Sequence, residues 1–218
     1  MSALLNEGGL AARKDALLLA LLPNVPFDGW TRSGMRAAAE RAEIDIAELP
    51  LLFPGGTRDV ASWFSDWADR QTLAALKRRH IGTMKIRERI AAGVMARLEI
   101  LLPHREAVRR SLSLFATPLN IPRGAKLLYD TVDAIWHAAG DRSTDFNFYT
   151  KRGLLAGVYA ATSLYWLDDR SDNMEATKAF LERRLAEVLA IPKLPERIGQ
   201  LNPLRVLKEA RQRFSAAR

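Results

Sequence analysis

The side chains best suited to chemistry in this 218-residue sequence are three histidines, His80, His104 and His137. None lies three or four residues from another, as a helical zinc site requires, and none has a carboxylate three residues before it, as a helical di-iron site requires. The sequence contains no cysteine, which excludes thiolate catalysis, zinc fingers and iron–sulfur clusters. It also lacks serine-hydrolase, P-loop and dinucleotide-binding motifs. We therefore predict no catalytic residue, no metal site and no cofactor.

A run of aspartates offers one alternative. Asp168-Asp169-Arg170-Ser171-Asp172 resembles the box with which all-helical prenyl synthases hold magnesium ions against a diphosphate. Those enzymes use two facing boxes, and the nearby pair Asp141 and Asp145 does not form a second one. The simpler interpretation is that the first two aspartates end one helix while Asp172, with Glu175 three residues later, forms a capping box for the next. A small prenyl-diphosphate-processing enzyme remains an alternative.

The elements that would position these groups are helices. Apolar residues recur at spacings of three and four almost throughout, and 48% of the residues are hydrophobic, which is enough to bury a core. Pro23 and Pro26 break the chain after the first helix, and no apolar run approaches the length of a membrane span. The sequence predicts an all-α protein with about ten helices, at residues 11–22, 31–42, 44–50, 57–78, 83–102, 104–116, 122–139, 145–167, 172–189 and 204–215.

The first helices have the layout of a helix-turn-helix head. Three short helices precede a long one, with turns near residues 27–29 and 54–56. The stretch Phe27-Asp28-Gly29-Trp30-Thr31, followed by small residues at 37–39 and 42, resembles the TetR family of ligand-responsive regulators. The sequence predicts three parts: a helix-turn-helix-like head over 1–58, a helical body for ligand binding and dimerisation over 59–191, and a linker with a basic C-terminal helix over 192–218.

The segment that would read DNA in such a head has the wrong charge. Residues 42–56 contain Glu43, Asp45 and Glu48 and no lysine or arginine, and Pro50 interrupts the segment. Three carboxylates repel a polyanion. We therefore expect no nucleic-acid partner, and a TetR-type transcriptional regulator stays an alternative.

Longer motifs resemble the Coq-nine family of coenzyme Q assembly proteins, over about residues 10–190. The Ser-Thr-Asp-Phe-Asn run at 143–147 is the most specific of them. The motifs are Leu22-Pro23-x-Val25-Pro26-Phe27-x-Gly29-Trp30-Thr31, Pro118-Leu119-Asn120-Ile121-Pro122, Val132-Asp133-x-x-Trp136-His137, Gly140-Asp141-x-Ser143-Thr144-Asp145-Phe146-Asn147-Phe148-Tyr149-Thr150-x-Arg152 and Thr177-x-x-Phe180-Leu181-x-x-Arg184.

This resemblance implies a non-catalytic, TetR-like homodimer of ubiquinone biosynthesis. Such a protein binds an isoprenoid quinone intermediate or a phospholipid in an apolar pocket and presents the quinone intermediate to a membrane-associated di-iron hydroxylase. The family's partner-facing patch falls on Ile135, Trp136, Phe148 and Tyr149, and this sequence departs from the family at Phe148, where tryptophan is common.

Apolar residues of the two helices around this patch are candidates for lining the lipid pocket. They are Leu127, Leu128, Val132, Leu155, Val158 and Tyr159. The alternative is that these residues fill an ordinary helix-bundle core, because periodicity alone does not distinguish a hollow core from a filled one.

Positive charge is concentrated near the C-terminus, where residues 193–218 supply five of the eight net positive charges. The predicted helix 204–215 places apolar residues near one face with bases around them, which is the pattern of a helix lying in an anionic membrane surface. The residues concerned are Leu204, Leu207 and Phe214 with Arg205, Lys208 and Arg211. Packing of this helix on the body or across a dimer is the alternative. With no cysteine and no recognisable targeting segment, we expect the bacterial cytoplasm, peripheral at the inner membrane.

Overall fold

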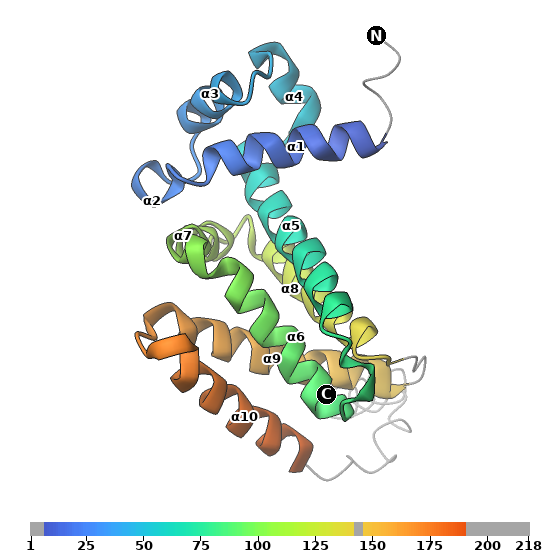
Figure 1. Ribbon diagram of the computed structural model, residues 1–218. Helices are drawn as coiled ribbons and strands as arrows, with labels where there is room; N and C mark the ends of the chain where they lie inside the picture. Colours follow the sequence, from blue (N-terminus) through green and yellow to red (C-terminus); the bar gives the residue numbers. More distant parts are fainter. Residues whose placement is uncertain (1–6, 142–145, 191–218) are drawn as a thin grey trace, which may run out of the picture.

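The computed structural model describes residues 7–141 and 146–190, and the side chains of residues 9–141 and 150–188 (Figure 1). This part of the chain is all-α, as predicted, and contains no strand. Its helices are α1 (Glu7–Leu21), α2 (Val25–Asp28), α3 (Arg32–Arg41), α4 (Leu49–Leu52), α5 (Thr57–Arg78), α6 (Ile86–Leu101), α7 (Arg105–Phe115), α8 (Ile121–Ala138), α9 (Phe146–Asp168) and α10 (Glu175–Ala190). The predicted helix 204–215, with all six proposed membrane-binding residues, lies outside the described residues.

No described helix combines the length and the apolar character that a membrane crossing requires. Nine of the predicted helices fall within the described chain, and each corresponds to helical structure there.

Two prolines that were expected to break the chain instead lie at the beginning of helices. Pro26 lies in the first turn of α2, and Pro50 lies in the first turn of α4, where a backbone N–H has no helical acceptor. The interpretation of Pro50 as an interruption was therefore wrong. The third predicted helix is instead a 3-10 turn, Ile46–Glu48, followed directly by the single turn of α4.

The predicted capping box at Asp172 and Glu175 was also wrong. Ser171 is the residue that caps this region, and its hydroxyl accepts a hydrogen bond from the backbone N–H of Ala176 at 3.0 Å. Asn173 and Met174, which lie between Ser171 and Ala176, adopt positive φ angles of 50° and 57°. The chain therefore turns once before α10 begins. A capping box requires a regular helical turn between its two members, and this turn is not regular.

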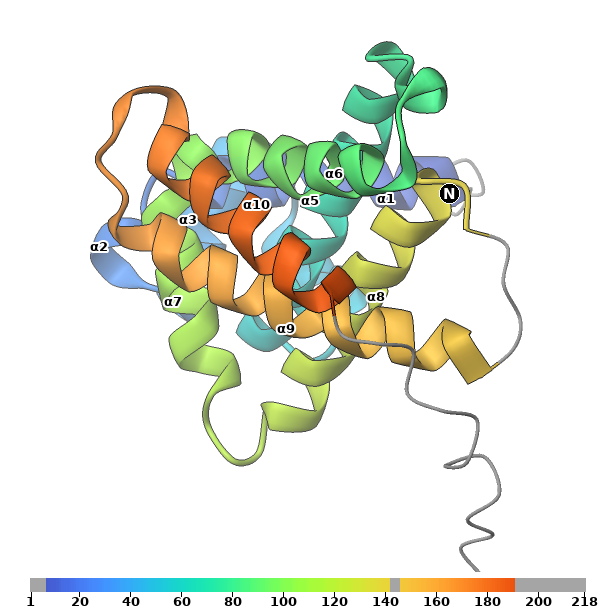
Figure 2. The ribbon, with the colours of Figure 1, turned by 90° about the horizontal axis from the view of Figure 1, so that it is seen from below.

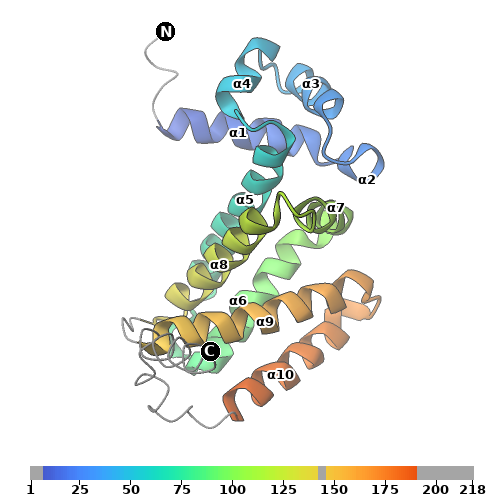
Figure 3. The same cartoon turned by 180° about the vertical axis from the view of Figure 1, so that it is seen from behind.

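The helices form a head and a body that share one core (Figure 1). In the head, α1 packs against α3 and α4. Helix α5 leaves the head and continues into the body, where it packs against α6 and α8, as Figure 3 shows from behind. Helices α9 and α10 lie side by side across the far end of the body (Figure 2). One cluster of buried residues runs from Leu17 in α1 to Leu185 in α10.

Close approach of α6 and α8 depends on a glycine. A Cβ atom at Gly93 would lie 2.8 Å from Cγ2 of Ile135, which is buried in α8. Real Cβ atoms do not approach that closely, so a larger residue at 93 would push the two helices apart. The β-branched Ile135 has little rotamer freedom with which to relieve the contact.

We predict that Gly93→Ala lowers the free energy of unfolding by about 1 to 2 kcal/mol, because overpacking costs roughly 1 to 3 kcal/mol and exceeds the helix-propensity gain. Gly157→Ala in α9 is the matched control, because nothing lies within 4 Å of its added Cβ. The control should gain roughly 0.5 to 1 kcal/mol. Urea denaturation measures both, and equal gains in the two variants would contradict the close contact.

Candidate ligand-binding cavity

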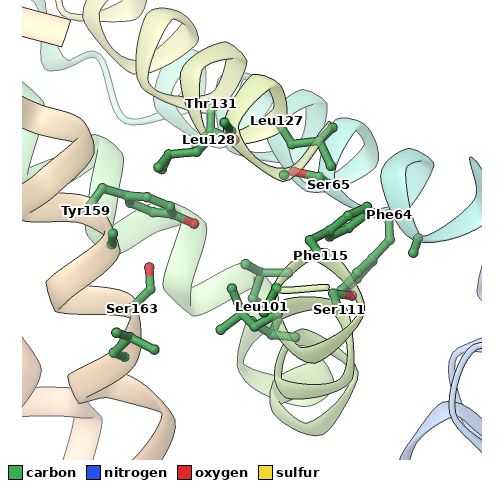
Figure 4. Close-up of a pocket in the computed structure, with 18 of the residues that line it drawn as sticks. Phe64, Ser65, Leu101, Ser111, Phe115, Leu127, Leu128, Thr131, Tyr159 and Ser163 are labelled. Carbon is green, nitrogen blue, oxygen red and sulfur yellow. The ribbon is translucent and has the colours of Figure 1, made fainter. Parts of the chain in front are cut away.

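A cavity of about 410 Å³ lies in the body among α5, α6, α7, α8 and α9 (Figure 4). Its lining is mainly aliphatic and aromatic. The lining residues are Ala61, Phe64, Ser65, Arg97, Leu101, Val108, Ser111, Leu112, Phe115, Ala116, Ile121, Gly124, Ala125, Leu127, Leu128, Thr131, Tyr159, Ala160, Ser163 and Leu164.

Helical periodicity brings these residues onto common faces. On α7 the lining residues follow the spacing i, i+3, i+4 and i+7, and α8 repeats that spacing from residue 124 to residue 131. The two helices can approach closely at Gly124 because glycine has no Cβ. An added Cβ there would lie 2.9 Å from the Cβ of Phe115. Each helix therefore presents one apolar face to the cavity and a polar face to solvent.

The buried guanidinium of Arg97 forms one side of the cavity and pairs with the half-buried carboxylate of Asp69. The Nε of Arg97 donates to a carboxylate oxygen of Asp69 at 2.9 Å, and its Nη2 donates to the hydroxyls of Ser65 at 2.9 Å and Thr131 at 3.1 Å. The Thr131 hydroxyl donates to the other Asp69 oxygen at 3.0 Å. The guanidinium lies 5.6 Å from the ring centroid of Tyr159. Burial raises the pKa of Asp69, and the Arg97 charge and the Thr131 hydrogen bond act in the opposite direction.

One hydroxyl of the lining has no partner within the described chain. The Oγ of Ser163 is buried and makes no hydrogen bond there. Figure 4 shows this hydroxyl and that of Tyr159 both pointing into the cavity. An unsatisfied buried hydroxyl costs roughly 1 to 3 kcal/mol, so a polar atom in this part of the cavity would be stabilised by it.

The rim of the cavity carries apolar side chains in contact with solvent. Leu112, Ile121 and Leu164 line the cavity and are 41%, 52% and 59% exposed. They come from three different helices, α7, α8 and α9, so the cavity opens to solvent between these helices. The site thus has an apolar mouth and a polar inner side.

Comparison with known proteins decides the family. The COQ9 family model matches residues 121–192. Human "Ubiquinone biosynthesis protein COQ9, mitochondrial" is 32% identical over 179 residues, which cover 79% of this chain and 56% of the human protein. The fission yeast relative of the same name, from Schizosaccharomyces pombe, is 27% identical over 212 residues, covering 93% of this chain and 82% of the relative. The chain belongs to the COQ9 family. It spans just over half the length of the human relative.

The TetR-like fold is also confirmed. A TetR transcriptional regulator from Nitrosomonas europaea superposes with a TM-score of 0.66 at 22% sequence identity, covering 81% of this chain and 97% of the regulator. At this identity the likeness concerns the fold alone.

The expected location in the bacterial cytoplasm was wrong. The COQ9 relatives compared, including those from human, cattle and fission yeast, are named mitochondrial. The absence of cysteine did not identify the compartment, because it is compatible with more than one reducing environment.

Three of the six residues proposed for lipid binding line the cavity, namely Leu127, Leu128 and Tyr159. The other three, Val132, Leu155 and Val158, are buried in the helix-bundle core and are not part of the lining. They lie on the same helices but on faces turned toward neighbouring helices. The contributions of α5, α6 and α7 were missed. The apolar spacing of α7 was a signal for an amphipathic helix, but it did not reveal which helix that face meets.

Two residues of the proposed COQ9-type partner patch are buried. Ile135 and Trp136 are 2% and 9% exposed, and the Trp136 indole donates to the backbone carbonyl of Lys151 at 3.3 Å. The described chain therefore does not present them at its surface. Phe148 and Tyr149 lie in the first turn of α9, and their side chains lie outside the described residues. A partner surface formed by these four residues stays a prediction.

The first two aspartates of the run at 168–172 have structural roles. The Asp169 carboxylate is buried and accepts hydrogen bonds from the backbone N–H of Ser171 at 2.8 Å and of Thr177 at 2.9 Å, and from the Thr177 hydroxyl. Asp168 instead pairs with Arg109 at the surface at 2.9 Å. Within the described residues no cluster of acidic or histidine side chains could hold a metal ion. The two aspartates therefore do not face a common ion.

Carboxylates of the head have similar roles. Asp45 caps the 3-10 turn by accepting from the N–H of Ala47 at 2.9 Å, and Glu48 pairs with Arg13 at 2.7 Å. The segment that would read DNA is thus one 3-10 turn and the four residues of α4, fixed by acidic side chains.

We predict that Asp169→Asn lowers the free energy of unfolding at pH 7 by about 1 to 3 kcal/mol, because a buried acceptor is lost. Burial alone would raise the pKa of Asp169, but its hydrogen bonds from Thr177 and Ser171 lower it to about 2, from an ordinary 3.8. The charged form therefore stabilises the fold above about pH 4, and this stabilisation is lost as the pH falls through about 2.

Urea denaturation between about pH 7 and pH 2.5 measures this effect. The difference between the wild-type protein and Asp169→Asn should shrink below about pH 4. Asp168→Asn is the control, because that side chain is 82% exposed, and it should change stability by less than about 1 kcal/mol. A difference that does not vary with pH would show that the carboxylate charge has no role.

Proposed function

We propose that this protein is a non-catalytic accessory protein of ubiquinone biosynthesis that holds an isoprenoid quinone intermediate or a phospholipid in its cavity. The relatives' names supply the pathway. The observation that supports lipid binding is a cavity with apolar walls, an apolar mouth and an unpaired hydroxyl inside. A ligand with a long apolar tail and a small polar head matches each of these features.

The walls favour hydrocarbon. Burial of one CH₂ group from water contributes about 0.8 kcal/mol, so each five-carbon isoprene unit contributes up to about 4 kcal/mol. The volume of about 410 Å³ lies toward the lower end of the range for small-molecule pockets, roughly 300 to 1,000 Å³. A long polyprenyl tail would exceed it. Part of such a tail would leave through the mouth, over Leu112, Ile121 and Leu164.

The inner side favours an oxygen-bearing head. The Ser163 hydroxyl can donate to a quinone or phosphate oxygen, and the Tyr159 hydroxyl points into the same space (Figure 4). Arg97 is the single charged residue among those lining the cavity, and its guanidinium is already bound to Asp69, Ser65 and Thr131. The lining contains no histidine, carboxylate or lysine, and Tyr159 is its one side chain of a type used in general acid–base catalysis, which supports a holding role rather than a chemical one.

Presentation of the ligand to a membrane-associated di-iron hydroxylase, dimerisation, and attachment of the C-terminal helix to an anionic membrane complete the proposal. The family resemblance supports the first two, and the basic sequence near the C-terminus supports the third. Together they would bring the mouth of the cavity to the bilayer from which an isoprenoid is drawn.

We predict that Ala160→Phe abolishes lipid copurification, because the larger side chain would occupy the cavity that Ala160 lines. Native mass spectrometry and solvent extraction of the purified protein measure the bound lipid, expected near one per subunit in the wild type. Ala161→Phe is the control, since it adds the same volume to the same helix at a position that does not line the cavity. Equal lipid content in the wild type and in Ala160→Phe would refute binding in this cavity.

We predict that Ser163→Ala weakens binding of a ubiquinone with two isoprene units by about 5- to 10-fold, which corresponds to one hydrogen bond. Binding of farnesane, a ring-free hydrocarbon, should be unchanged, and the ligand-free protein should lose no stability. Ser111→Ala is the matched control inside the cavity. Its hydroxyl is satisfied, because it donates to the carbonyl of Ala107 at 2.9 Å and accepts from the Trp30 indole at 3.0 Å.

Ser111→Ala should therefore lower stability without changing the preference for the quinone over farnesane. If Ser163→Ala weakens both ligands equally, the hydroxyl does not contact the head group. Titration calorimetry or quenching of tryptophan fluorescence gives the affinities.

A further inference from the structure

A second concave site lies in the head and shares no residue with the cavity. It is a groove of about 480 Å³ between α3, α4 and the beginning of α5. Its lining combines three arginines with an apolar floor. The lining residues are Arg32, Met35, Arg36, Ile46, Leu49, Pro50, Phe53, Pro54, Gly55, Gly56 and Arg58.

The three arginines lack carboxylate partners. Within the described chain, Arg32, Arg36 and Arg58 form no ion pair. Arg58 donates from Nη1 to the side-chain oxygen of Asn120 at 3.3 Å, but its Nε is buried without a hydrogen-bond partner. Three cations around one groove repel one another, and a buried guanidinium N–H without an acceptor is costly. An anion in the groove would relieve both effects.

Three nearby carboxylates do not supply that anion, because each of the three is engaged elsewhere. Glu48 pairs with Arg13 at 2.7 Å, and Asp59 pairs with Arg123 at 2.9 Å and accepts from the N–H of Gly55. Asp45 is bound to the N–H of Ala47. The groove therefore presents a local positive charge, although the surrounding sequence contains several acids.

The floor and edge of the groove are apolar. Met35, Leu49 and Phe53 are buried beneath it. Ile46 lines the groove and is 43% exposed, and Leu51 in the adjacent turn of α4 is 77% exposed. Large apolar side chains that point into water beside unpaired arginines are typical of surfaces that enter the interface of a lipid bilayer.

We propose that this groove binds the phosphate of an anionic phospholipid at a membrane surface, with Arg32, Arg36 and Arg58 around the phosphate and with Ile46 and Leu51 inserted at the level of the glycerol and first acyl carbons. A membrane fits better than duplex DNA, because the sugar–phosphate backbone offers no apolar layer to Ile46 and Leu51. The head of a TetR-like fold thereby keeps a phosphate-binding function without reading bases. This inference does not depend on the ligand of the cavity.

The test is cosedimentation of the full chain with vesicles of phosphatidylcholine containing phosphatidylglycerol. The variant is Arg32→Gln/Arg36→Gln/Arg58→Gln. A matched control, Lys77→Gln/Arg78→Gln/Lys178→Gln, removes the same charge from exposed positions outside the groove. Each base at an anionic surface contributes about a fivefold gain in binding, so the groove variant should lose about 100-fold. The control should lose less than about threefold.

A second variant tests the apolar contact with the membrane at a position where a substitution should not disturb the fold. Leu51→Glu changes a side chain that is 77% exposed, so the fold should be unaffected, yet membrane partitioning should fall at least about tenfold. Inorganic phosphate should not compete with the vesicles, which distinguishes a lipid head group from a free anion. Circular-dichroism melting curves of all variants accompany the binding data.

Three outcomes would overturn the proposal. Equal losses in the groove variant and the control would show that net charge alone drives binding. Full binding by Leu51→Glu would show that no apolar insertion occurs. Loss of duplex-DNA binding by the groove variant, with vesicle binding unchanged, would assign the arginines to nucleic acid. Residues 191–218 have the same sequence in every protein compared, so their contribution to binding is the same in each.

Discussion

The guanidinium of Arg97 is buried at the centre of the body, and the arrangement of α5, α6 and α8 depends on how it is paired. A buried charge without a partner is strongly destabilising, so the Asp69 carboxylate on α5 and the Thr131 hydroxyl on α8 must both reach it on α6. This requirement fixes the relative rotation of the three helices. It also fixes one side of the cavity, because Arg97, Ser65 and Thr131 are lining residues. The polar side of the site is thus a consequence of the packing of the body.

The connection between the head and the body is also specific. Trp30, at the start of α3, donates its indole N–H to Ser111 in the cavity wall at 3.0 Å and packs on Phe64, which lines the cavity. Arg110 of α7 donates to the backbone carbonyl of Pro26 in α2 at 3.1 Å. These contacts join α2 and the residue before the N-cap of α3 to helix α7, which lines the cavity. The groove of the head is lined by residues of α3, which follows Trp30 directly in the sequence, so the two proposed lipid-binding sites lie on connected parts of the fold.

The two sites differ in the kind of contact that they offer. The cavity has apolar walls, an ion pair that is neutral overall and a buried hydroxyl without a partner, that of Ser163, which suits a neutral isoprenoid or an acyl chain. The groove has unpaired cations at its edge and exposed aliphatic side chains, which suits a charged head group in a membrane. The proposed transfer of a very hydrophobic compound from a bilayer would use both kinds of surface. The groove lies at the beginning of α5, where Arg58 lines it, and the cavity lies along the next turns of the same helix, where Ala61, Phe64 and Ser65 line it.

The sequence by itself determined the helices, the family and the TetR-like arrangement. Helical periodicity is a local property, so nine helices could be placed from the spacing of apolar residues, and the Ser-Thr-Asp-Phe-Asn run identified the family. Periodicity also placed Leu127, Leu128 and Tyr159 on faces that line the cavity. It did not separate them from Val132, Leu155 and Val158, because all six are apolar residues on the same two helices.

Only the tertiary structure decided which of those faces surround a space and which are packed. A cavity exists where side chains from α5, α7 and α9, far apart in the sequence, fail to fill a volume, and no local pattern records that failure. The same reason explains Asp169. Its motif suggested a metal ligand, but the turn that follows directs the carboxylate back onto the N–H groups of Ser171 and Thr177. The direction of a side chain at the end of a helix depends on the φ and ψ angles of the next few residues, and the sequence alone did not determine those angles.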